Sequence, residues 1–379
     1  MANNNENKIL NVPHLRFPEF SGEWVTKSIN DLAVVIGGGT PDTTVKSYWD
    51  GEIQWFTPSE IGKNKYVDSS LRTITEVGLN NSSAKLLPPN TILLSSRATI
   101  GECSLSLREC ATNQGFQCLV SKKCNVDFLY YLIQTKKKDL IRKSCGSTFL
   151  EISANEVRKI QVSVPSDVEQ QKIAELLSLI DERIATQNKI IEKLQSLIKG
   201  IAQHCIKEST SGNTYVKLGD ICQITTGKLD ANAQVDNGIY PFFTCAEQPF
   251  KIDSFAFDTE ALLISGNGAN LGYINYYHGK FNAYQRTYVL DIFSENIQYI
   301  KWALKVLLPK RIALEKSSSN TPYIVLSTLS DLRLPIPNKS IQCHIAKLMQ
   351  SLERKLSSQI ALNGSYNRLK QYLLRQMFI

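Results

Sequence analysis

Glycine-rich segments come first among the residues that could do chemistry, because glycine-rich loops can cradle phosphate groups. Gly266, Gly268 and Gly272 have the spacing G-x-G-x-x-x-G and lie outside any β-α-β unit, whereas dinucleotide-binding loops have the spacing G-x-G-x-x-G inside one. Gly227-Lys228 lacks both the upstream glycine and the following Ser or Thr of a phosphate-binding loop. The glycines therefore argue against a nucleotide site.

The acidic, histidine and cysteine residues also lack the spacing of a catalytic or metal site. Pro41-Asp42 has no Asp/Glu-x-Lys between it and Asp68, so no metal-dependent nuclease centre is visible. The four histidines are scattered, and no Ser, Cys or Lys nucleophile stands in a recognisable motif. The nine cysteines are an odd number without a C-x-x-C pair. We therefore expect no catalytic residue, no metal, no bound cofactor and reduced thiols.

Composition describes a soluble chain with a mild basic excess. The 379 residues are enough for two to three domains, and 42% hydrophobic residues can form a sizeable core. Lys and Arg number 43 against 35 Asp and Glu, a net charge of +8 that suits a polyanionic partner but is also common among other proteins. No window approaches ~18 consecutive apolar residues, and no apolar segment follows the polar N-terminus. We expect a cytoplasmic protein without a membrane segment.

The elements that would position any site occur twice along the chain. Residues 164–177 align without a gap on residues 336–349, so that Pro165 meets Pro337 and Gln170 meets Gln342. The openings of the two copies, 29–32 and 218–221, also match, and Gln114 corresponds to Gln285. The first copy carries about 16 extra residues, which we expect between positions 62 and 85. Each copy is thus a variable globe followed by a similar tail.

The tails are predicted to be long helices with an apolar seam. Ser166 and Asn338 follow Pro165 and Pro337 and can cap them. In the first tail a 40-residue helix over 167–206 would be roughly 60 Å long. Its seam alternates spacings of four and three, which is typical of coiled coils. The seam residues are Ile173, Leu177, Ile180, Ile184, Gln187, Ile191 and Leu194, then Ile345, Met349, Leu352, Leu356 and Gln359.

A helix of this length needs a partner along its side, and the other tail offers the same seam. We expect the two helices to pair as an antiparallel coiled coil about a pseudo-twofold axis, with Gln187 facing Gln359. The second seam is weaker, because Asn363 and Lys370 occupy seam positions. In the alternative arrangement, each helix packs only on its own globe.

The globes are predicted to be α+β. Short strand-like runs alternate with Gly and Asn clusters, and each copy has one apolar helix-like segment, at 127–140 and 296–308. The expected organisation is an N-terminal arm (1–19), a first globe (20–165), a first helix (166–207), a linker (208–214), a second globe (215–337) and a second helix (338–379).

Several short motifs in a fixed order give this chain a family resemblance. They are Asn11-Val-Pro-His-Leu-Arg-Phe-Pro-Glu-Phe-Ser-Gly-Glu-Trp24, Gly38-Gly-Thr-Pro41, Tyr48-Trp-Asp-Gly-Glu-Ile-Gln-Trp55, Leu94-Ser-Ser-Arg-Ala-Thr-Ile-Gly101, Asn113-Gln114, and Pro165 followed by Glu169-Gln-Gln-Lys-Ile-Ala174. Each is weak alone, but their order and the twofold repeat are specific. The chain resembles the specificity (S) subunits of type I DNA restriction–modification systems over nearly its whole length.

The resemblance implies a non-catalytic protein that binds double-stranded DNA. Each globe would be a target recognition domain for one half of a split sequence. The helices would set the spacer between the halves and dock two modification (methyltransferase) subunits, and restriction (translocase/nuclease) subunits would join them. S-adenosylmethionine, ATP and Mg²⁺ would bind to those partner subunits only. Because Gly38-Gly-Thr-Pro41 becomes Thr226-Gly-Lys-Leu229 in the second copy, the globes would read different sequences.

DNA reading needs hydrogen-bonding side chains on protruding loops, and phosphate binding needs cations or loop amides. For a single lysine the alternative is an ordinary solvated charge, and for Arg97, Gln114 and Gln285 it is a hydrogen bond to a neighbouring loop. The predicted DNA-contacting residues are Thr40, Lys63, Lys65, Arg97 and Gln114 in the first globe, and Lys228, Asn267, Gln285, Arg286 and Lys316 in the second.

Two other functions compete with this one. A stand-alone DNA methyltransferase or nuclease would need an F-x-G-x-G or N-P-P-F/Y type motif, and the sequence has neither. A coiled-coil scaffold without a nucleic-acid role would not need two variable, loop-rich globes.

Overall fold

The computed structural model describes residues 10–146, 150–209, 214–315 and 323–379. The chain divides into two compact units. The first comprises Met1–Asn188 with Leu362–Ile379, and the second comprises Lys189–Ala361. Each unit therefore contains one globe and a part of each tail.

The globe of the first unit is built on a five-stranded and a three-stranded sheet, with strand orders β2-β9-β6-β7-β4 and β5-β3-β8, and a separate β1-β10 pair. Its elements are β1 (Val25–Ser28), α1 (Ile29–Leu32), β2 (Ala33–Gly37), β3 (Trp49–Phe56), β4 (Tyr66–Val67), β5 (Arg72–Ile74), α2 (Glu76–Asn80), β6 (Ile92–Leu94), β7 (Cys103–Ser106), β8 (Cys110–Thr112), β9 (Gln117–Ser121), α3 (Val126–Thr135), α4 (Lys137–Arg142), α5 (Ala154–Lys159) and β10 (Gln161–Val164).

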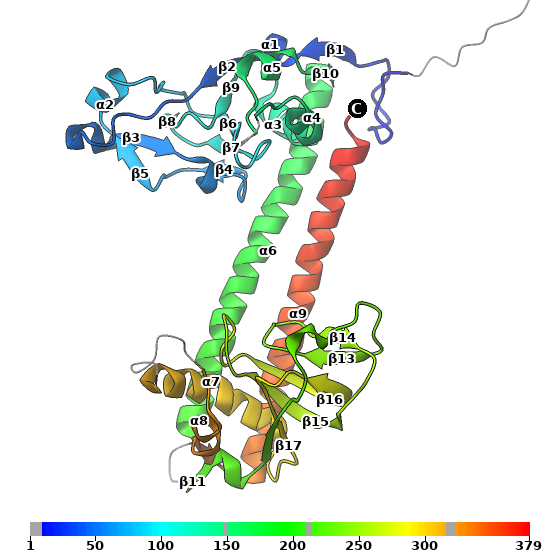
Figure 1. Ribbon diagram of the computed structural model, residues 1–379. Helices are drawn as coiled ribbons and strands as arrows, with labels where there is room; N and C mark the ends of the chain where they lie inside the picture. Colours follow the sequence, from blue (N-terminus) through cyan, green and yellow to red (C-terminus); the bar gives the residue numbers. More distant parts are fainter. Residues whose placement is uncertain (1–9, 147–149, 210–213, 316–322) are drawn as a thin grey trace, which may run out of the picture. The chain divides into compact units, whose positions relative to one another are not determined.

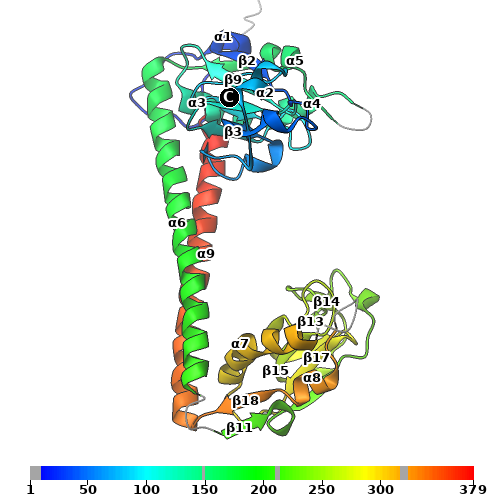
Figure 2. The ribbon, with the colours of Figure 1, turned by 90° about the vertical axis from the view of Figure 1, so that its left-hand side faces the viewer.

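The globe of the second unit has one six-stranded sheet, in the order β12-β17-β15-β16-β13-β14, and a β11-β18 pair. Helix α7 packs against this sheet (Figure 2). The elements are β11 (Thr214–Lys217), β12 (Gln223–Thr226), β13 (Tyr240–Phe243), β14 (Phe250–Ile252), β15 (Phe257–Ser265), β16 (Ile274–Ala283), β17 (Thr287–Asp291), α7 (Ile297–Glu315), α8 (Leu326–Ser330) and β18 (Arg333–Ile336).

Strand register shows that the two globes are copies of one plan. Val25 pairs with Val164 in the first globe, and the residues at the offsets found in the sequence, Thr214 and Ile336, pair in the second. The β2–β9 and β12–β17 pairs repeat this agreement, because Gly37 lies opposite Gln117 and Thr226 lies opposite Tyr288. The internal repeat inferred from the tails therefore extends through the globes.

The extra residues of the first copy lie on both sides of β5. Trp55 pairs with Arg72, 17 residues further on, whereas the equivalent Phe242 pairs with Phe250, only 8 residues further on. The remainder of the extra length lies between β5 and β6, where α2 has no counterpart in the second globe among the described residues. The segment expected at 62–85 is thus two separate insertions around one strand that both globes share.

In each globe a hydrophobic core lies on each face of the largest sheet, because successive side chains of a central strand point to opposite faces. In β15, Leu262 and Ile264 pack with α7 and the long helices, while Ala261 and Leu263 face a second cluster that contains Phe243 and Phe281. The first globe repeats this arrangement along β6. Because both faces of these central strands are buried, apolar residues follow one another along the strand, and the sequence shows a continuous apolar run without polar alternation.

The tails form α6 (Asp167–Glu208) and α9 (Lys339–Gln376), and they run antiparallel. In the first unit the beginning of α6 lies beside the end of α9 (Figure 1), with Ile173 and Leu177 in one cluster with Leu373 and Leu374. In the second unit the end of α6, with Ile198 and Ala202, packs with the beginning of α9. The seam residues predicted in both tails are buried or half-buried. The predicted pairing is therefore confirmed, and each helix also packs on its own globe.

Polar seam residues of α9 find polar partners on α6, which explains why the weaker seam still pairs. Nζ of Lys370 lies 2.7 Å from Oδ1 of Asp181, and Nδ2 of Asn363 donates to Oδ1 of Asn188 at 2.8 Å. A buried cation or amide is tolerated at a seam when a partner of the complementary kind faces it.

The expected helix caps are present, but two helices differ from expectation. Ser166 and Asn338 accept bonds from the N–H groups of Glu169 and Ile341 at 3.4 and 3.0 Å. The single helix expected at 127–140 is divided into α3 and α4, and α7 continues through Pro309, beyond the expected end at 308. None of the described helices is both long and apolar enough to cross a lipid bilayer.

Candidate nucleic-acid interface

Three loops meet at the same place in each globe. In the first globe they are the Thr40 loop (residues 38–41), the Arg97 loop (95–101) and the Gln114 loop (113–116). In the second globe their counterparts are the Lys228 loop (227–230), the Asn267 loop (265–272) and the Gln285 loop (284–287). The residues predicted to contact DNA lie mainly on these six loops.

The Gln114 and Gln285 loops begin where parallel strand pairs end. Phe56 of β3 lies opposite Thr112 of β8, and the Asn113 N–H donates to the Phe56 carbonyl at 3.1 Å. In the second globe Phe243 lies opposite Ala283, and the Tyr284 N–H donates to the Phe243 carbonyl at 2.9 Å. The sheet therefore holds the two glutamines at equivalent sites.

In each globe one backbone hydrogen bond joins two of these loops: the Arg97 and Gln114 loops in the first globe, and the Asn267 and Gln285 loops in the second. The Ser96 N–H donates to the Gly115 carbonyl at 2.8 Å, and the Gly266 N–H donates to the Arg286 carbonyl at 2.8 Å. The loops also share their backbone shape, since Ala98 has a φ of 55° where Gly268 has 78°. An alanine in this left-handed region is strained, so the surrounding contacts must impose this shape.

Glycine is required where the Thr40 loop crosses the Gln114 loop, and where the Lys228 loop crosses the Gln285 loop. A Cβ atom on Gly38 would lie 2.0 Å from the Asn113 carbonyl oxygen, and one on Gly227 would lie 1.9 Å from that of Ala283. Backbone-to-backbone contact of this kind admits no side chain. The sequence pattern retains this glycine in both copies, while the residues around it differ.

Two comparisons with known proteins bear on this arrangement. A family model described as the type I restriction modification DNA specificity domain matches residues 21–196 and again residues 210–363. The type I restriction enzyme MjaIX specificity subunit of Methanocaldococcus jannaschii is 30% identical over 379 residues, which is 88% of this chain and 88% of that protein. The chain belongs to the type I restriction–modification DNA specificity family.

Further similarities agree with this assignment. The EcoDI specificity subunit of Escherichia coli is 42% identical over 143 residues, 38% of this chain and 32% of that protein. The crystal structure of the S subunit of a type I system from M. genitalium has the same fold, with a TM-score of 0.64 at 19% identity over 97% of this chain and 99% of that one. The protein is accordingly a DNA specificity subunit, whose part in the system is sequence recognition and not catalysis.

In the first globe of the specificity subunit, the structure brings Thr40 and Gln114 together. The Thr40 hydroxyl donates a hydrogen bond to Oε1 of the exposed Gln114 side chain. Arg97, on the adjoining loop, has its Nε 2.9 Å from Oε1 of Glu151 and is about two-fifths exposed. Arg97 and Gln114 thus make contacts within the protein and remain accessible at the surface.

In the second globe, Asn267, Gln285 and Arg286 lie on joined loops. Oδ1 of Asn267 accepts a bond from the Cys245 thiol at 3.0 Å, and the same thiol lies 3.6 Å from the Arg286 carbonyl oxygen. Gln285 and Arg286 have exposed side chains, as does Lys228 on the crossing loop. Of these four predicted residues, Lys228, Gln285 and Arg286 are exposed and Asn267 is half-buried on the adjoining loop.

The remaining predicted residues lie elsewhere. Nζ of Lys65 is 2.6 Å from Oδ1 of Asp127 and donates to Oγ of Ser178 at 2.7 Å, and its side chain is only 7% exposed. Lys65 therefore links the globe to α6 and does not join the three loops. Lys63 is exposed on the segment between β3 and β4, and Lys316 lies outside the described residues.

Two tryptophans that the sequence prediction did not assign to the site hold the Thr40 loop. The indole N–H of Trp55 donates to the Gly39 carbonyl at 2.9 Å, and that of Trp49 donates to the Asp42 carbonyl at 3.1 Å. The exposed Arg72 guanidinium lies 3.5 Å from the centre of the Trp49 ring. The Tyr48–Trp55 motif contained both indoles, but only the fold shows that their N–H groups meet this loop.

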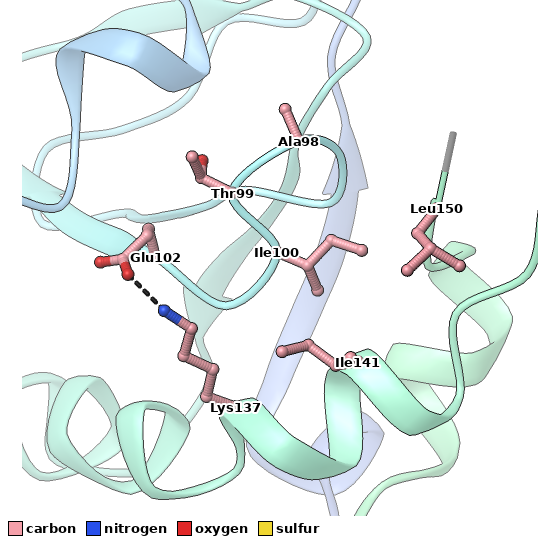
Figure 3. Close-up of a pocket in the computed structure, with 7 residues that line it drawn as sticks. All are labelled: Ala98, Thr99, Ile100, Glu102, Lys137, Ile141 and Leu150. Carbon is pink, nitrogen blue, oxygen red and sulfur yellow. Dashed lines mark hydrogen bonds and ion pairs between the residues drawn. The ribbon is translucent and has the colours of Figure 1, made fainter. Parts of the chain in front are cut away.

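A hollow of about 610 Å³ lies behind the Arg97 loop (Figure 3). Ile100, Ile141 and Leu150 give it apolar walls, and Lys137 forms an ion pair with Glu102 at its edge. None of the predicted DNA-contacting residues lines it within the described part of the chain. This hollow and the predicted DNA-contacting side chains therefore do not coincide.

Buried cysteines of the specificity subunit are poor nucleophiles. Burial raises the pKa of Cys103 and Cys118 to about 12 and that of Cys110 to about 11, so these thiols stay protonated near neutral pH. No group of three or more metal-binding side chains was found among the described residues.

Proposed function

We propose that the protein is the sequence-reading subunit of a type I restriction–modification complex, and that each globe reads one half of a bipartite double-stranded DNA target. The observation that carries this proposal is the repeated loop cluster. Equivalent strand ends, the same inter-loop bond and the same glycine contact hold Gln114 and Gln285 in the two globes. Different exposed side chains on one scaffold suit two readers of different sequences.

The target recognition domains proposed here are residues 20–165 and 215–337. An N-terminal arm (1–19), two spacer helices (166–207 and 338–379) and a linker (208–214) complete the chain. The reading surface of the first domain comprises Thr40, Arg97 and Gln114, and Lys63 is a further proposed DNA contact. That of the second comprises Lys228, Asn267, Gln285 and Arg286.

The helices are proposed to set the spacer between the half-sites and to dock two methyltransferase subunits. Restriction subunits with translocase and nuclease activity would join the same assembly in the cytoplasm of a bacterium or archaeon. S-adenosylmethionine, ATP and Mg²⁺ would bind to these partners. A stand-alone methyltransferase or nuclease is not favoured, because the six loops of the two clusters carry amides and cations, and their described residues include no cluster of catalytic groups.

A domain exchange tests the proposal. Residues 20–165 are replaced by the corresponding globe of a relative with another known target, and the chimera is assembled with its methyltransferase subunits. Sequencing of methylated DNA should show one new half-site and one unchanged half-site. The matched control replaces residues 215–337 and should change the other half only.

Two results would contradict this function. An exchange that altered both half-sites would exclude independent readers. Methyl transfer by the purified chain alone with S-adenosylmethionine would show that it is itself an enzyme.

A further inference from the structure

Thr40 and Gln114 come from different loops and meet side chain to side chain, and the described part of the second globe has no equivalent of this contact. Gly37 and Thr226 lie at equivalent ends of β2 and β12, so the structure shifts the motif comparison by one residue. Leu229, and not Lys228, occupies the position that corresponds to Thr40, and its apolar side chain offers no hydroxyl to Gln285. The backbone N–H of Gln285 donates instead to the Leu229 carbonyl at 2.9 Å. The two glutamines thus occupy matched loops but differ in what holds their amide groups.

Hydrogen bonds hold the backbone before and after Thr40, which restricts the position of its hydroxyl. After Thr40, the Trp49 indole N–H donates to the Asp42 carbonyl at 3.1 Å. The Gly39 N–H donates to the Thr112 carbonyl at 2.8 Å, and the Gly39 carbonyl accepts from the Trp55 indole at 2.9 Å. Gly38 touches the Asn113 carbonyl so closely that no Cβ would fit. The loop cannot move away from Gln114 without breaking these contacts.

This donor decides which edge of the Gln114 amide faces outward. Oε1 accepts from Thr40, whereas the described residues make no hydrogen bond to Nε2, and the side chain is exposed. A glutamine with both amide atoms available reads adenine by donating to N7 and accepting from the N6 amino group. With Oε1 engaged by Thr40, the amide group of Gln114 that has no partner among the described residues is Nε2, which carries two N–H donors.

A donor-only edge matches guanine better than adenine in the major groove. Guanine presents two neighbouring acceptors, N7 and O6, whereas adenine presents N7 beside an amino donor. An adenine amino group would meet the Gln114 amino group, donor against donor. The described part of the second globe leaves both amide atoms of Gln285 without a hydrogen-bond partner, so Gln285 retains the donor and the acceptor that adenine needs.

We propose that Thr40 is a specificity-determining positioning residue. It orients the Gln114 amide so that the first globe selects guanine over adenine at one base pair, while Gln285 suits adenine at the matching position of the other half-site. The inference rests on the proposed function, because it requires the Gln114 loop to enter the major groove.

The test uses the full chain assembled with its methyltransferase subunits and a duplex library randomised over the first half-site. Methylated molecules are sequenced for the unaltered protein and for Thr40→Val, which removes the hydroxyl and keeps the shape of the side chain. The guanine-to-adenine ratio at one base pair should fall roughly tenfold or more, since a well-formed base contact discriminates at this level. Thr40→Ser keeps a hydroxyl and should preserve the ratio.

Gln114→Ala separates failure of this inference from failure of the proposed function. It should abolish base preference at the same pair. If Gln114→Ala removes that preference but Thr40→Val does not shift it, the role of Thr40 is wrong while the reading surface stands. If Gln114→Ala changes no base preference, the proposed reading surface is wrong.

Two further outcomes would overturn the inference. The unaltered protein would select adenine at this pair if the Gln114 amide were oriented the other way. If Thr40→Val lowered methylation of all library sequences equally, without changing the base preference at any position, the hydroxyl would only maintain loop structure.

Discussion

In each unit, one buried glutamine joins the globe to the helix that follows it. Nε2 of Gln170 donates to the Pro165 carbonyl at 3.0 Å, and its Oε1 accepts from the Asn125 N–H at 3.1 Å. Gln342 repeats both bonds in the second unit. The residue before each glutamine differs between the two units. Glu169 precedes Gln170 and is 1% exposed, whereas Ile341 precedes Gln342 and is 42% exposed.

Glu169 holds residues 10–24, which comprise the end of the N-terminal arm and the start of the first globe. Its carboxylate accepts two bonds of 2.8 Å from Arg16 and one of 3.3 Å from the Trp24 indole. The bond to Glu169 raises the pKa of Arg16, which therefore remains charged. The second unit carries an exposed Ile341 at the equivalent position.

At the scale of single residues, we predict that Glu169→Ala destabilises the contact of residues 10–24 with α6 by about 2 kcal/mol, because hydrogen bonds to a charged group are lost. Hydrogen–deuterium exchange should increase at the amides of Leu15 and Trp24, which are bonded to Gln376 and Asn11. Ile341→Ala is the matched control and should leave exchange unchanged. Unaltered protection of the Trp24 amide in Glu169→Ala would contradict this role.

At the scale of elements, the helix seam of the first unit contains an ion pair whose lysine is replaced by an apolar residue in the second unit. In the first unit Lys370 and Asp181, each 15% exposed, form an ion pair across the seam, and the Tyr131 hydroxyl donates to Asp181 at 2.7 Å. Burial, and next the Asp181 charge, raise the pKa of Tyr131, so this hydroxyl remains a donor. In the second unit the position equivalent to Lys370 is the buried Ile198.

We predict that Lys370→Met lowers the free energy of unfolding of the first unit by about 2 kcal/mol, because Asp181 loses its cationic partner in a partly buried site. Adding Asp181→Asn should recover part of this loss, and a double-mutant cycle in urea measures the coupling. Lys347→Met, at an exposed position of α9, should stay within about 0.5 kcal/mol of the unaltered protein. Additive effects of the Lys370 and Asp181 substitutions would contradict the coupling.

At the scale of the whole molecule, both long helices contribute to both units. The first unit contains the beginning of α6 and the end of α9, and the second contains the end of α6 and the beginning of α9. Gln187, which is 5% exposed, and the half-buried Gln359 lie close to the unit boundaries. That these two amides face each other stays a prediction.

We predict that one heptad inserted after Gln187 and one after Gln359 lengthens the unspecified spacer and leaves both half-sites unchanged. Seven residues add roughly 10 Å to a helix, which is about three base pairs of duplex. Matched insertion keeps every seam residue on the same face. Sequencing of methylated sites gives the spacer length, and an unchanged spacer would exclude the helices as its determinant.

The sequence by itself determined the repeat, the helix seam and the family. These are periodic or local features: apolar side chains at alternating spacings of three and four, prolines before capped helices, and matched residues such as Gln170 and Gln342. Local chemistry is legible in a sequence because neighbouring residues set it directly. The loops that carry Gln114 and Gln285 followed from the same repeat.

Only the tertiary structure decided which of the loop residues meet. Lys65 has the type and loop position of a phosphate contact, yet it is buried against Asp127 and Ser178, 62 and 113 residues away. The Trp55 bond to Gly39 and the Thr40 bond to Gln114 likewise join residues distant in the chain. Such contacts depend on how strands pair across the sheet, and no local pattern encodes that pairing.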